Sequence, residues 1–282
     1  MKFQNIIQLI CTVFAIAILA YALIFTKFIK NKAEHSVGAE SIYAELGAIN
    51  TEGNLLAAQA MQQARDFIQA GQYNNAYEKL RFIVNFYPDV PFAPDARRIL
   101  GELNMDQLMS PNNMRGKSVY TVQKGDSLSR IASKNRTTVE AIMALNALMN
   151  PQRIQPQQEL VVMPLTFRIL INVKQKRVVV YNQETYVKEY PILDLLYPSK
   201  QSRTATSVAR TVAYEGASLY NRISPYYREN PKMLTLKHGN LVIRAVKHPD
   251  EPDLGKGFFL SSSDMEELNL LVKSGTPVEI QL

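Results

Sequence analysis

Three consecutive serines and two histidines are the side chains that come nearest to a nucleophile and its base. Nucleophilic acyl transfer requires a thiolate or an activated hydroxyl, a base within hydrogen-bonding reach, and donors for the oxyanion. A serine before a helix commonly caps it, and a lone histidine is more often a surface residue than a catalyst. We therefore favour a capping role for Ser262 or Ser263 over an active site in which Ser261, Ser262 or Ser263 acts with His238 or His248.

The only cysteine of the chain, Cys11, lies in an apolar N-terminal run. One cysteine in this position rules out an internal disulfide, a cysteine-based metal site and a cysteine nucleophile in the rest of the chain. We predict neither a metal nor a cofactor.

Tyrosines and arginines are interspersed along a later stretch, where they could line a cleft for sugar or peptide through stacking and charge. These residues are Tyr214, Tyr220, Tyr226 and Tyr227, with Arg210, Arg222 and Arg228. Such side chains more often pack half-buried with solvated tips, which is the interpretation that we favour.

Residues 119–164 are predicted to form a strand, two short helices and a second strand. Apolar and polar residues alternate around Tyr120, as in a strand, and a glycine-containing turn follows. Asp126 or Ser127 can cap the first helix, and Thr137-Thr138 can start the second. Such a unit is about the smallest that can bury one apolar face.

This stretch resembles the LysM family of peptidoglycan- and chitin-binding modules. The resemblance rests on YTVQKGDSLSRIA, on Leu145-Asn146 and on IQPQQELVVMP, where Pro156-Gln157-Gln158 departs from the family's Pro-Gly-Gln. It implies that glycans containing N-acetylglucosamine lie in a shallow groove between two loops. The implied contact residues are Gly125, Asp126, Ser127 and Leu128 in one loop and Asn150, Pro151, Gln152, Arg153 and Ile154 in the other. A turn at Gly125 and a cap at Asp126 would also explain these two residues without a ligand.

From residue 165 onward the pattern becomes mostly β, with one late helix. Alternating apolar residues indicate a meander of three strands, followed later by separate strands. The expected elements are strands at 167–173, 178–181, 186–192, 240–246 and 278–282 and a helix that opens at Ser263.

Residues 165–282 resemble the L,D-transpeptidase (YkuD-type) catalytic domain. The resemblance rests on FRILINVKQKRVVVYNQETYVKEYPI and on GFFLSSSDMEELNLLVKSGTPVEI. Enzymes of that family use a cysteine acyl-enzyme within an SHGC-type motif followed by Ile-Arg-Leu, with a histidine on an earlier strand.

Carried over to this sequence, the family's cysteine falls on Gly257, its motif histidine on Gly255, its arginine on Phe259 and its upstream histidine on Arg244. None of these four residue types is retained, and the family's Thr-Pro-x-Gly-type segment is missing from residues 199–212. Glycine has no side chain that could form an acyl-enzyme. We therefore predict no catalytic residue in this domain and interpret it as a pseudoenzyme.

The first 30 residues are predicted to anchor the chain in a membrane. Ile6 to Phe25 is a run of 20 residues without a charge, which at about 1.5 Å per residue approximates the ~30 Å hydrocarbon core. Lysines are richer on its C-terminal side, which favours a cytoplasmic location for that side, whereas a glycan-binding module belongs outside. We follow the expected location of the module and place the C-terminal side of this run outside the cytoplasm. A cleaved signal peptide ending near Ala20-Tyr21-Ala22 is the alternative.

Residues 31–54 are interpreted as a polar stalk, residues 55–109 as a helical spacer and residues 110–118 as a linker. Helical spacing of apolar residues predicts three helices in the spacer. Its sequence AGQYNNAYEKLRFIVNFYP is similar to the tetratricopeptide helix pair, although about three such repeats are needed for a stable solenoid. A spacer is favoured over a protein-binding surface.

The expected fold class is α+β multidomain, with an N-terminal transmembrane helix, an α-helical hairpin spacer, a βααβ LysM module and a mostly-β L,D-transpeptidase-like domain. The net charge of +7 suits an acidic partner, but no nucleic-acid motif accompanies it. We expect a single-pass protein of the bacterial inner membrane, with its bulk in the periplasm or outside, that attaches without catalysis to peptidoglycan glycan strands. The alternatives are an L,D-transpeptidase or carboxypeptidase with a non-cysteine site, and a scaffold whose helical region binds an envelope protein.

Overall fold

The computed structural model of the chain describes residues 52–197, 202–246 and 255–282. The expected membrane helix, the alternative cleavage site, the stalk up to residue 51, Cys11 and His248 all lie outside these ranges. Within the ranges, no helix is long and apolar enough to cross a membrane. The membrane anchor therefore stays a prediction.

Two helices, α3 (Glu52–Gln69) and α4 (Tyr73–Phe86), pack together in the first of two compact units. Ala64 on α3 and Leu80 on α4 are both fully buried. Gly71 ends α3 with a φ of +72°, a left-handed conformation that glycine adopts without strain. The helix pair and its break therefore agree with the periodicity of the sequence.

Helix α5 (Ala93–Met109) leads into the second unit, Asp95–Leu282, and packs there against strand β5 (Thr185–Pro191). The Tyr186 hydroxyl on β5 donates a 2.9 Å hydrogen bond to the carbonyl of Arg97 on α5. Burial raises the pKa of this tyrosine far above its usual value, so the hydroxyl keeps the proton that it donates. The sequence pattern grouped α5 with the spacer, whereas these polar contacts join it to the β-rich part.

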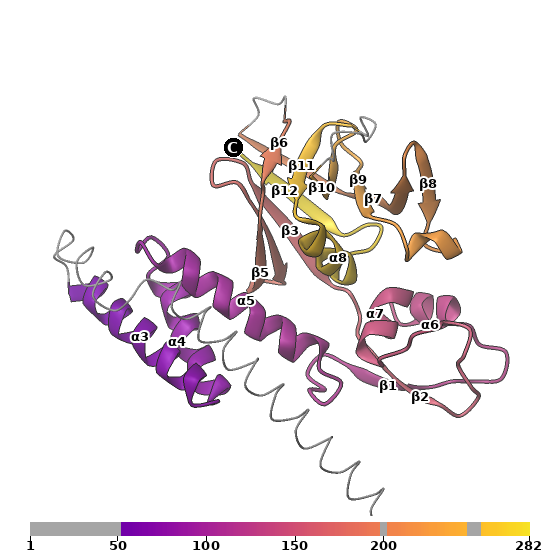
Figure 1. The fold of residues 1–282 in the computed structure, drawn as a ribbon, viewed down its shortest axis with the longest axis horizontal. Helices are drawn as coiled ribbons and strands as arrows, with labels where there is room; N and C mark the ends of the chain where they lie inside the picture. The colour runs from indigo at the N-terminus through magenta and orange to yellow at the C-terminus, as the bar shows by residue number, and fades with distance from the viewer. Residues whose placement is uncertain (1–51, 198–201, 247–254) are drawn as a thin grey trace, which may run out of the picture. The chain divides into compact units, whose positions relative to one another are not determined.

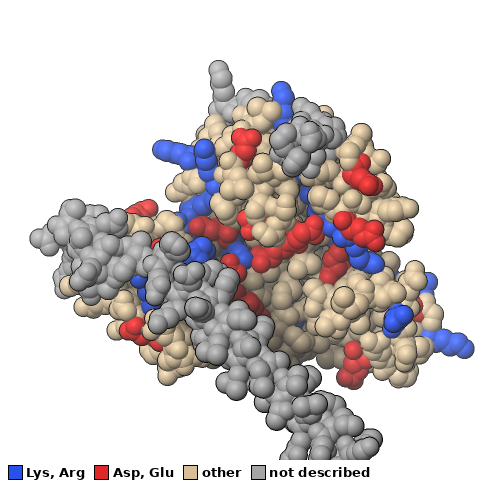
Figure 2. Space-filling view, in the orientation of Figure 1, with Lys and Arg blue, Asp and Glu red and all other residues tan. Residues whose placement is uncertain are grey.

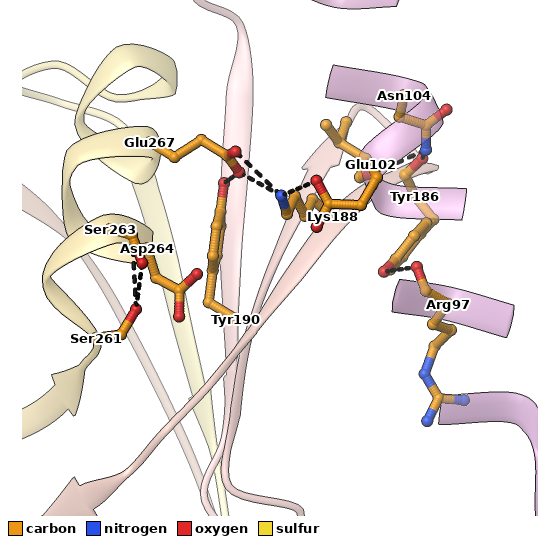
Figure 3. Close-up of polar contacts among 11 residues, drawn as sticks. Arg97, Glu102, Asn104, Tyr186, Lys188, Tyr190, Ser261, Ser263, Asp264 and Glu267 are labelled. Carbon is orange, nitrogen blue, oxygen red and sulfur yellow. Dashed lines mark hydrogen bonds and ion pairs between the residues drawn. The ribbon is translucent and has the colours of Figure 1, made fainter. Parts of the chain in front are cut away.

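Lys188 connects α5, β5 and helix α8 (Ser262–Leu271) through its ammonium group, as Figure 3 shows. The residue is 7% exposed, and its Nζ lies 3.0 Å from Glu102 on α5 and 2.7 Å from Glu267 on α8. Burial by itself lowers the pKa of a lysine, but the hydrogen bonds with Glu267 and Glu102 outweigh it and raise the pKa of Lys188. Tyr190 donates a further 2.9 Å hydrogen bond to Glu267. Three elements are thus joined at one buried charge.

Residues 118–162 fold, as predicted, into a strand, two helices and a second strand. The elements are β1 (Ser118–Thr121), α6 (Leu128–Lys134), α7 (Val139–Leu145) and β2 (Glu159–Val162), and the two strands pair antiparallel. Ser127 caps α6 and Thr138 caps α7, each by accepting a hydrogen bond from a backbone N–H in the first turn. Asp126, the other residue predicted as a possible cap of the first helix, does not cap α6.

The rest of the second unit is built on a ten-stranded sheet against which α8 packs (Figure 1). The strand order is β5-β4-β3-β12-β7-β9-β10-β11-β6, with β8 paired to β7. The pairings of β3 with β12 and of β10 with β11 are parallel. Besides β5, the elements are β3 (Phe167–Asn172), β4 (Arg177–Asn182), β6 (Asp194–Leu195), β7 (Arg203–Glu215), β8 (Ser218–Asn221), the 3-10 turn η1 (Pro225–Tyr227), β9 (Lys232–Leu236), β10 (Val242–Ala245), β11 (Gly257–Leu260) and β12 (Pro277–Gln281).

Strand β7 has 13 residues and was not predicted from the sequence. Its pairing with β9 shifts register between Val208 and Arg210, a bulge that interrupts the alternation of buried and exposed residues. One end of β7 pairs with β12 and the other with β9. Alternation of apolar and polar residues is the main sequence signal of a strand. Because the bulge interrupts this alternation, β7 could not be recognised from the sequence.

On the face drawn in Figure 2, basic and acidic side chains are interspersed and uncharged surface covers most of the rest. Elsewhere the structure contains exposed pairs such as Arg168 with Glu184, at 3.0 Å, where Glu184 is 92% exposed. The net positive charge is therefore not gathered into one basic field on this face.

The substitution Glu267→Gln should destabilise the second unit, because Lys188 would lose one of its two carboxylate partners. We expect unfolding free energy to fall by about 1–2 kcal/mol, less than for a fully buried pair because Glu267 still reaches water. Urea unfolding measures this. Glu184→Gln is the matched control in an exposed pair and should cost less than about 0.5 kcal/mol; equal losses in the two variants would contradict a supporting role for Lys188.

Candidate functional site

Both loops implied to contact glycan are anchored at the same end of the β1–β2 ladder. Beyond the last ladder pair, Val122 accepts a hydrogen bond from the N–H of Gln157 and donates one to the carbonyl of Gln158. The first loop begins at this end and the second loop leads back to it. The ladder therefore brings residues 125–128 and 150–154 to one end of the module.

Asp126 organises the first loop. Its carboxylate accepts a 2.9 Å hydrogen bond from the Gln123 N–H and a 2.8 Å bond from the Tyr120 hydroxyl. These two bonds, in that order of importance, hold the pKa of Asp126 below its usual value. The carbonyl of Gly125, a residue with a φ of +87°, accepts a 2.7 Å bond from the side chain of Arg130. The turn is thus shaped by the protein before a ligand arrives.

The nine implied contact residues differ in their exposure. Those that are exposed are Gly125, Ser127, Asn150, Gln152 and Arg153, and those that are partly exposed are Asp126, Pro151 and Ile154. Leu128 is 2% exposed and belongs to the apolar core of the module, against which Ile154 also packs. The side chain of Leu128 therefore supports the loop from below. In the second loop, Asn150 Oδ1 accepts a 2.8 Å bond from the Gln152 N–H.

Asn146 fixes the second helix to the closing strand, a role that the sequence pattern did not reveal. Its Nδ2 donates to the carbonyl of Val161 at 2.8 Å, and its Oδ1 accepts from the N–H of the same residue at 2.8 Å. The amide also donates to the carbonyl of Ile142 at 2.7 Å. One side chain thus satisfies backbone groups on both elements and holds the second loop at its root.

Gly257, on which the resemblance to the transpeptidase family places the cysteine, begins strand β11 and is buried. A Cβ atom on this residue would lie 1.8 Å from the carbonyl oxygen of Val242 and 2.7 Å from its nitrogen. Cβ atoms essentially never approach another heavy atom within 3.0 Å, and the obstacle here is the backbone of the neighbouring strand β10. A thiol-bearing side chain does not fit at this position without separating two paired strands.

Arg244 and Phe259 stand opposite each other in the β10–β11 ladder. Arg244 is 1% exposed, and its guanidinium carbon lies 5.3 Å from the ring centroid of Phe259 and 5.6 Å from that of Tyr214. Attraction between the cation and these rings offsets part of the cost of burying the charge. An arginine side chain keeps its proton in proteins and cannot replace a histidine base. Gly255, on which the same resemblance places the motif histidine, has a φ of +118°.

The serines near this region serve as a helix cap. Ser261 Oγ accepts a 3.1 Å hydrogen bond from the N–H of Asp264 and lies 3.0 Å from Ser263 Oγ (Figure 3). The cap of α8 is thus Ser261, and the prediction of Ser262 or Ser263 was wrong by one or two positions. The acidic Asp264 lies in the first turn, where the helix dipole favours it.

The tyrosines between β7 and β9 do not form one cleft wall. Tyr214 and Tyr227 are buried, and the Tyr227 hydroxyl donates a 2.7 Å hydrogen bond to a side chain of α8. Tyr220 and Tyr226 form a tilted ring pair with centroids 5.2 Å apart, and Tyr226 is 54% exposed. Packing explains the first two tyrosines, as the sequence favoured.

Residues 120–162 match the LysM domain family, which confirms the module predicted from the sequence. LysM domains bind peptidoglycan, so the match supports a protein associated with the cell wall. The chain is also similar to the N-acetylmuramoyl-L-alanine amidase sle1 of Staphylococcus aureus strains USA300 and N315, with 39% identity over 83 residues. These residues make up 29% of this chain and 25% of the amidase, so the chain spans about a quarter of the length of these curated relatives.

Among solved structures, the chain is similar to the catalytic domain of an E. faecium L,D-transpeptidase acylated by ertapenem. The identity is 15% and the TM-score 0.26, over 41% of this chain and 96% of that domain. The positions carried over from the transpeptidase family therefore rest on the residues of the two sequence segments.

Asp126→Ala should weaken binding of an N-acetylglucosamine tetramer about tenfold, because the turn loses two hydrogen bonds that shape it. Calorimetric titration measures the affinity. Glu159→Ala, which removes an exposed carboxylate from β2 of the same module, is the control and should leave the affinity unchanged. Because hydrogen bonds to its carboxylate hold the pKa of Asp126 below its usual value, binding should stay constant as the pH falls from neutral and decline only below the usual pKa of an aspartate. Unchanged affinity in Asp126→Ala would refute a role for this turn.

Gly257→Cys should lower unfolding free energy by more than about 2 kcal/mol, because the new Cβ meets the Val242 backbone. Urea unfolding measures this loss. Gly216→Cys is the control, since a Cβ there meets nothing within 4 Å and only left-handed strain of about 1 kcal/mol remains. A Gly257→Cys protein as stable as wild type would show that β10 leaves room for a side chain at this position.

Proposed function

We propose that the chain is a peptidoglycan-binding protein of the bacterial envelope, anchored in the inner membrane by residues 6–25. Its LysM domain would hold glycan strands that contain N-acetylglucosamine, and residues 165–282 would form a non-catalytic L,D-transpeptidase-like domain. The observation that carries this proposal is the LysM domain at residues 120–162, with a turn already shaped by Asp126.

The contact of Gly257 with Val242 supports a domain without acyl-transfer chemistry. The family's mechanism needs a nucleophile where the backbone of β10 leaves no room for a side chain. The nearby serine Ser261 is engaged as the cap of α8. Binding by the LysM domain is then the activity that the chain retains.

An envelope scaffold is the second candidate, favoured by apolar side chains exposed on the helix pair. Leu56 on α3 is 47% exposed, and Phe86 on α4 is 70% exposed with its ring 5.5 Å from that of Phe82. A groove of about 380 Å³ lies between the two helices beside Leu56 and Phe82. In this role the helix pair would bind another envelope protein while the LysM domain attaches the chain to the wall.

Sedimentation with purified sacculi tests peptidoglycan binding by the full chain. Wild type should pellet with the sacculi, and the variant Ser127→Ala/Gln152→Ala/Arg153→Ala should pellet at least about tenfold less, because polar contacts from both loops are removed. The control Lys174→Ala/Gln175→Ala/Lys237→Ala changes three exposed residues of the β-rich domain and should pellet like wild type.

The same incubation tests the enzymatic alternative. Muropeptides from the treated sacculi should show neither new cross-links nor shortened peptides by liquid chromatography and mass spectrometry. Loss of pelleting in the control as well as the loop variant would argue against the LysM loops, and changed muropeptides would argue against a non-catalytic domain.

A further inference from the structure

A groove of about 470 Å³ lies between the LysM helices and the edge of the β-rich domain, within the second compact unit. This volume is in the range of small-molecule and short-peptide sites. The groove is separate from the two glycan loops and from the region of Gly257. Its walls include Ser129, Thr137 and Val139 of the LysM domain and Thr211, Ile223 and Lys273 of the β-rich domain.

An ion pair between Glu140 on α7 and Arg222, which follows β8, holds the two walls together. Glu140 is 9% exposed. The guanidinium of Arg222 also donates to Asn269 Oδ1 at 2.9 Å and to the carbonyl of Val272 at 3.1 Å. A largely buried pair of this kind is sensitive to geometry. The spacing of the walls is therefore set by the protein and not by a ligand.

Every charged side chain that lines the groove is basic: Arg210, Arg222 and Lys273. Arg222 is neutralised by Glu140, whereas Arg210 and Lys273 make no ion pair with any residue that the structure describes. Arg210 is exposed, Lys273 is partly exposed, and the apolar side chain of Ile223 beside them is 86% exposed. A positive rim next to apolar surface is complementary to a short chain that carries carboxylates.

Two threonines, one on each wall, have hydroxyl groups without a hydrogen-bond partner among the described residues. Thr137 is 7% exposed and Thr211 is 6% exposed. A buried hydroxyl that lacks a partner costs free energy. Both threonines line the groove, and a hydroxyl group can donate to or accept from a polar ligand.

The groove also adjoins the first glycan loop, because its wall residue Ser129 directly follows Leu128 in the chain. We propose that the groove binds the short, carboxylate-bearing peptides that branch from a glycan strand held by the two LysM loops. This inference rests on the proposed peptidoglycan binding and adds a second contact to it. N-acetylglucosamine is uncharged, and the carboxyl group of N-acetylmuramic acid is bound in the amide that carries the peptide. The negative charges that such a chain brings to Arg210 and Lys273 are therefore the peptide carboxylates.

The test compares two probes with the full chain. One is soluble peptidoglycan glycan chains that keep their peptides, and the other is the same chains after an amidase has removed the peptides and the lactyl carboxylates that it exposes have been converted to methyl amides. Wild type should bind the peptide-bearing chains at least about tenfold more tightly, since each charged hydrogen bond contributes about that much. The variant Arg210→Ala/Lys273→Ala should lose this preference and bind both probes as wild type binds the bare glycan.

The control Lys174→Ala/Lys237→Ala removes the same net charge from exposed positions outside the groove and should keep the preference. Equal wild-type affinity for the two probes would overturn the inference, as would an equal loss in the control. Failure of wild type to bind either probe would instead overturn the proposed function. The two failures are therefore distinguishable.

Discussion

The ion pair between Glu140 and Arg222 determines how the LysM domain is placed against the β-rich domain. Both groups are largely withdrawn from water, and removal of one partner from a buried pair costs about 3–5 kcal/mol because the other charge stays unpaired. The pair is therefore a strict geometric requirement and only a modest source of net stability. A LysM domain tethered only by a linker would have no reason to bury a carboxylate on its second helix.

Helix α8 completes this arrangement with side chains that reach in two directions. Asn269 accepts hydrogen bonds from both Arg222 and Tyr227 with one amide oxygen. Two residues earlier, Glu267 pairs with Lys188 and so connects α8 to β5 and α5. Cooperative polar contacts of this kind favour one packing arrangement over its alternatives. Displacement of α8 would therefore disturb α5 and the LysM domain together.

Local features of the fold could be predicted from the sequence, and long-range partners could not. Ser127 and Thr138 cap their helices as the pattern indicated, because a cap depends on residues within one turn. The meander and the LysM elements were likewise found from periodicity and turn residues. Strand β7 was missed because a bulge breaks its alternation.

The candidate sites also differ in whether they depend on residues close together in the chain or on long-range partners. The two glycan loops follow from a family pattern, and the shaping of the first loop by Asp126 needs only Tyr120 and Gln123 nearby. Nothing in the sequence pattern linked Glu140 to Arg222, because the two residues lie 82 positions apart along the chain. The groove could not be predicted for the same reason: its walls come from segments that only the tertiary structure brings together.

The close approach of β10 and β11 at Gly257 limits what this position of the β-rich domain can do. A nucleophile needs space around its side chain for an acyl group, whereas the parallel pairing of β10 with β11 brings the Val242 backbone into the place of a Cβ atom. This close parallel pairing continues the buried sheet up to Gly257. A rigid domain clamped to a LysM domain by Arg222 presents fixed surfaces on both sides of a basic groove. Preorganised surfaces lose less conformational entropy on binding, and this gain in affinity does not depend on a catalysed reaction.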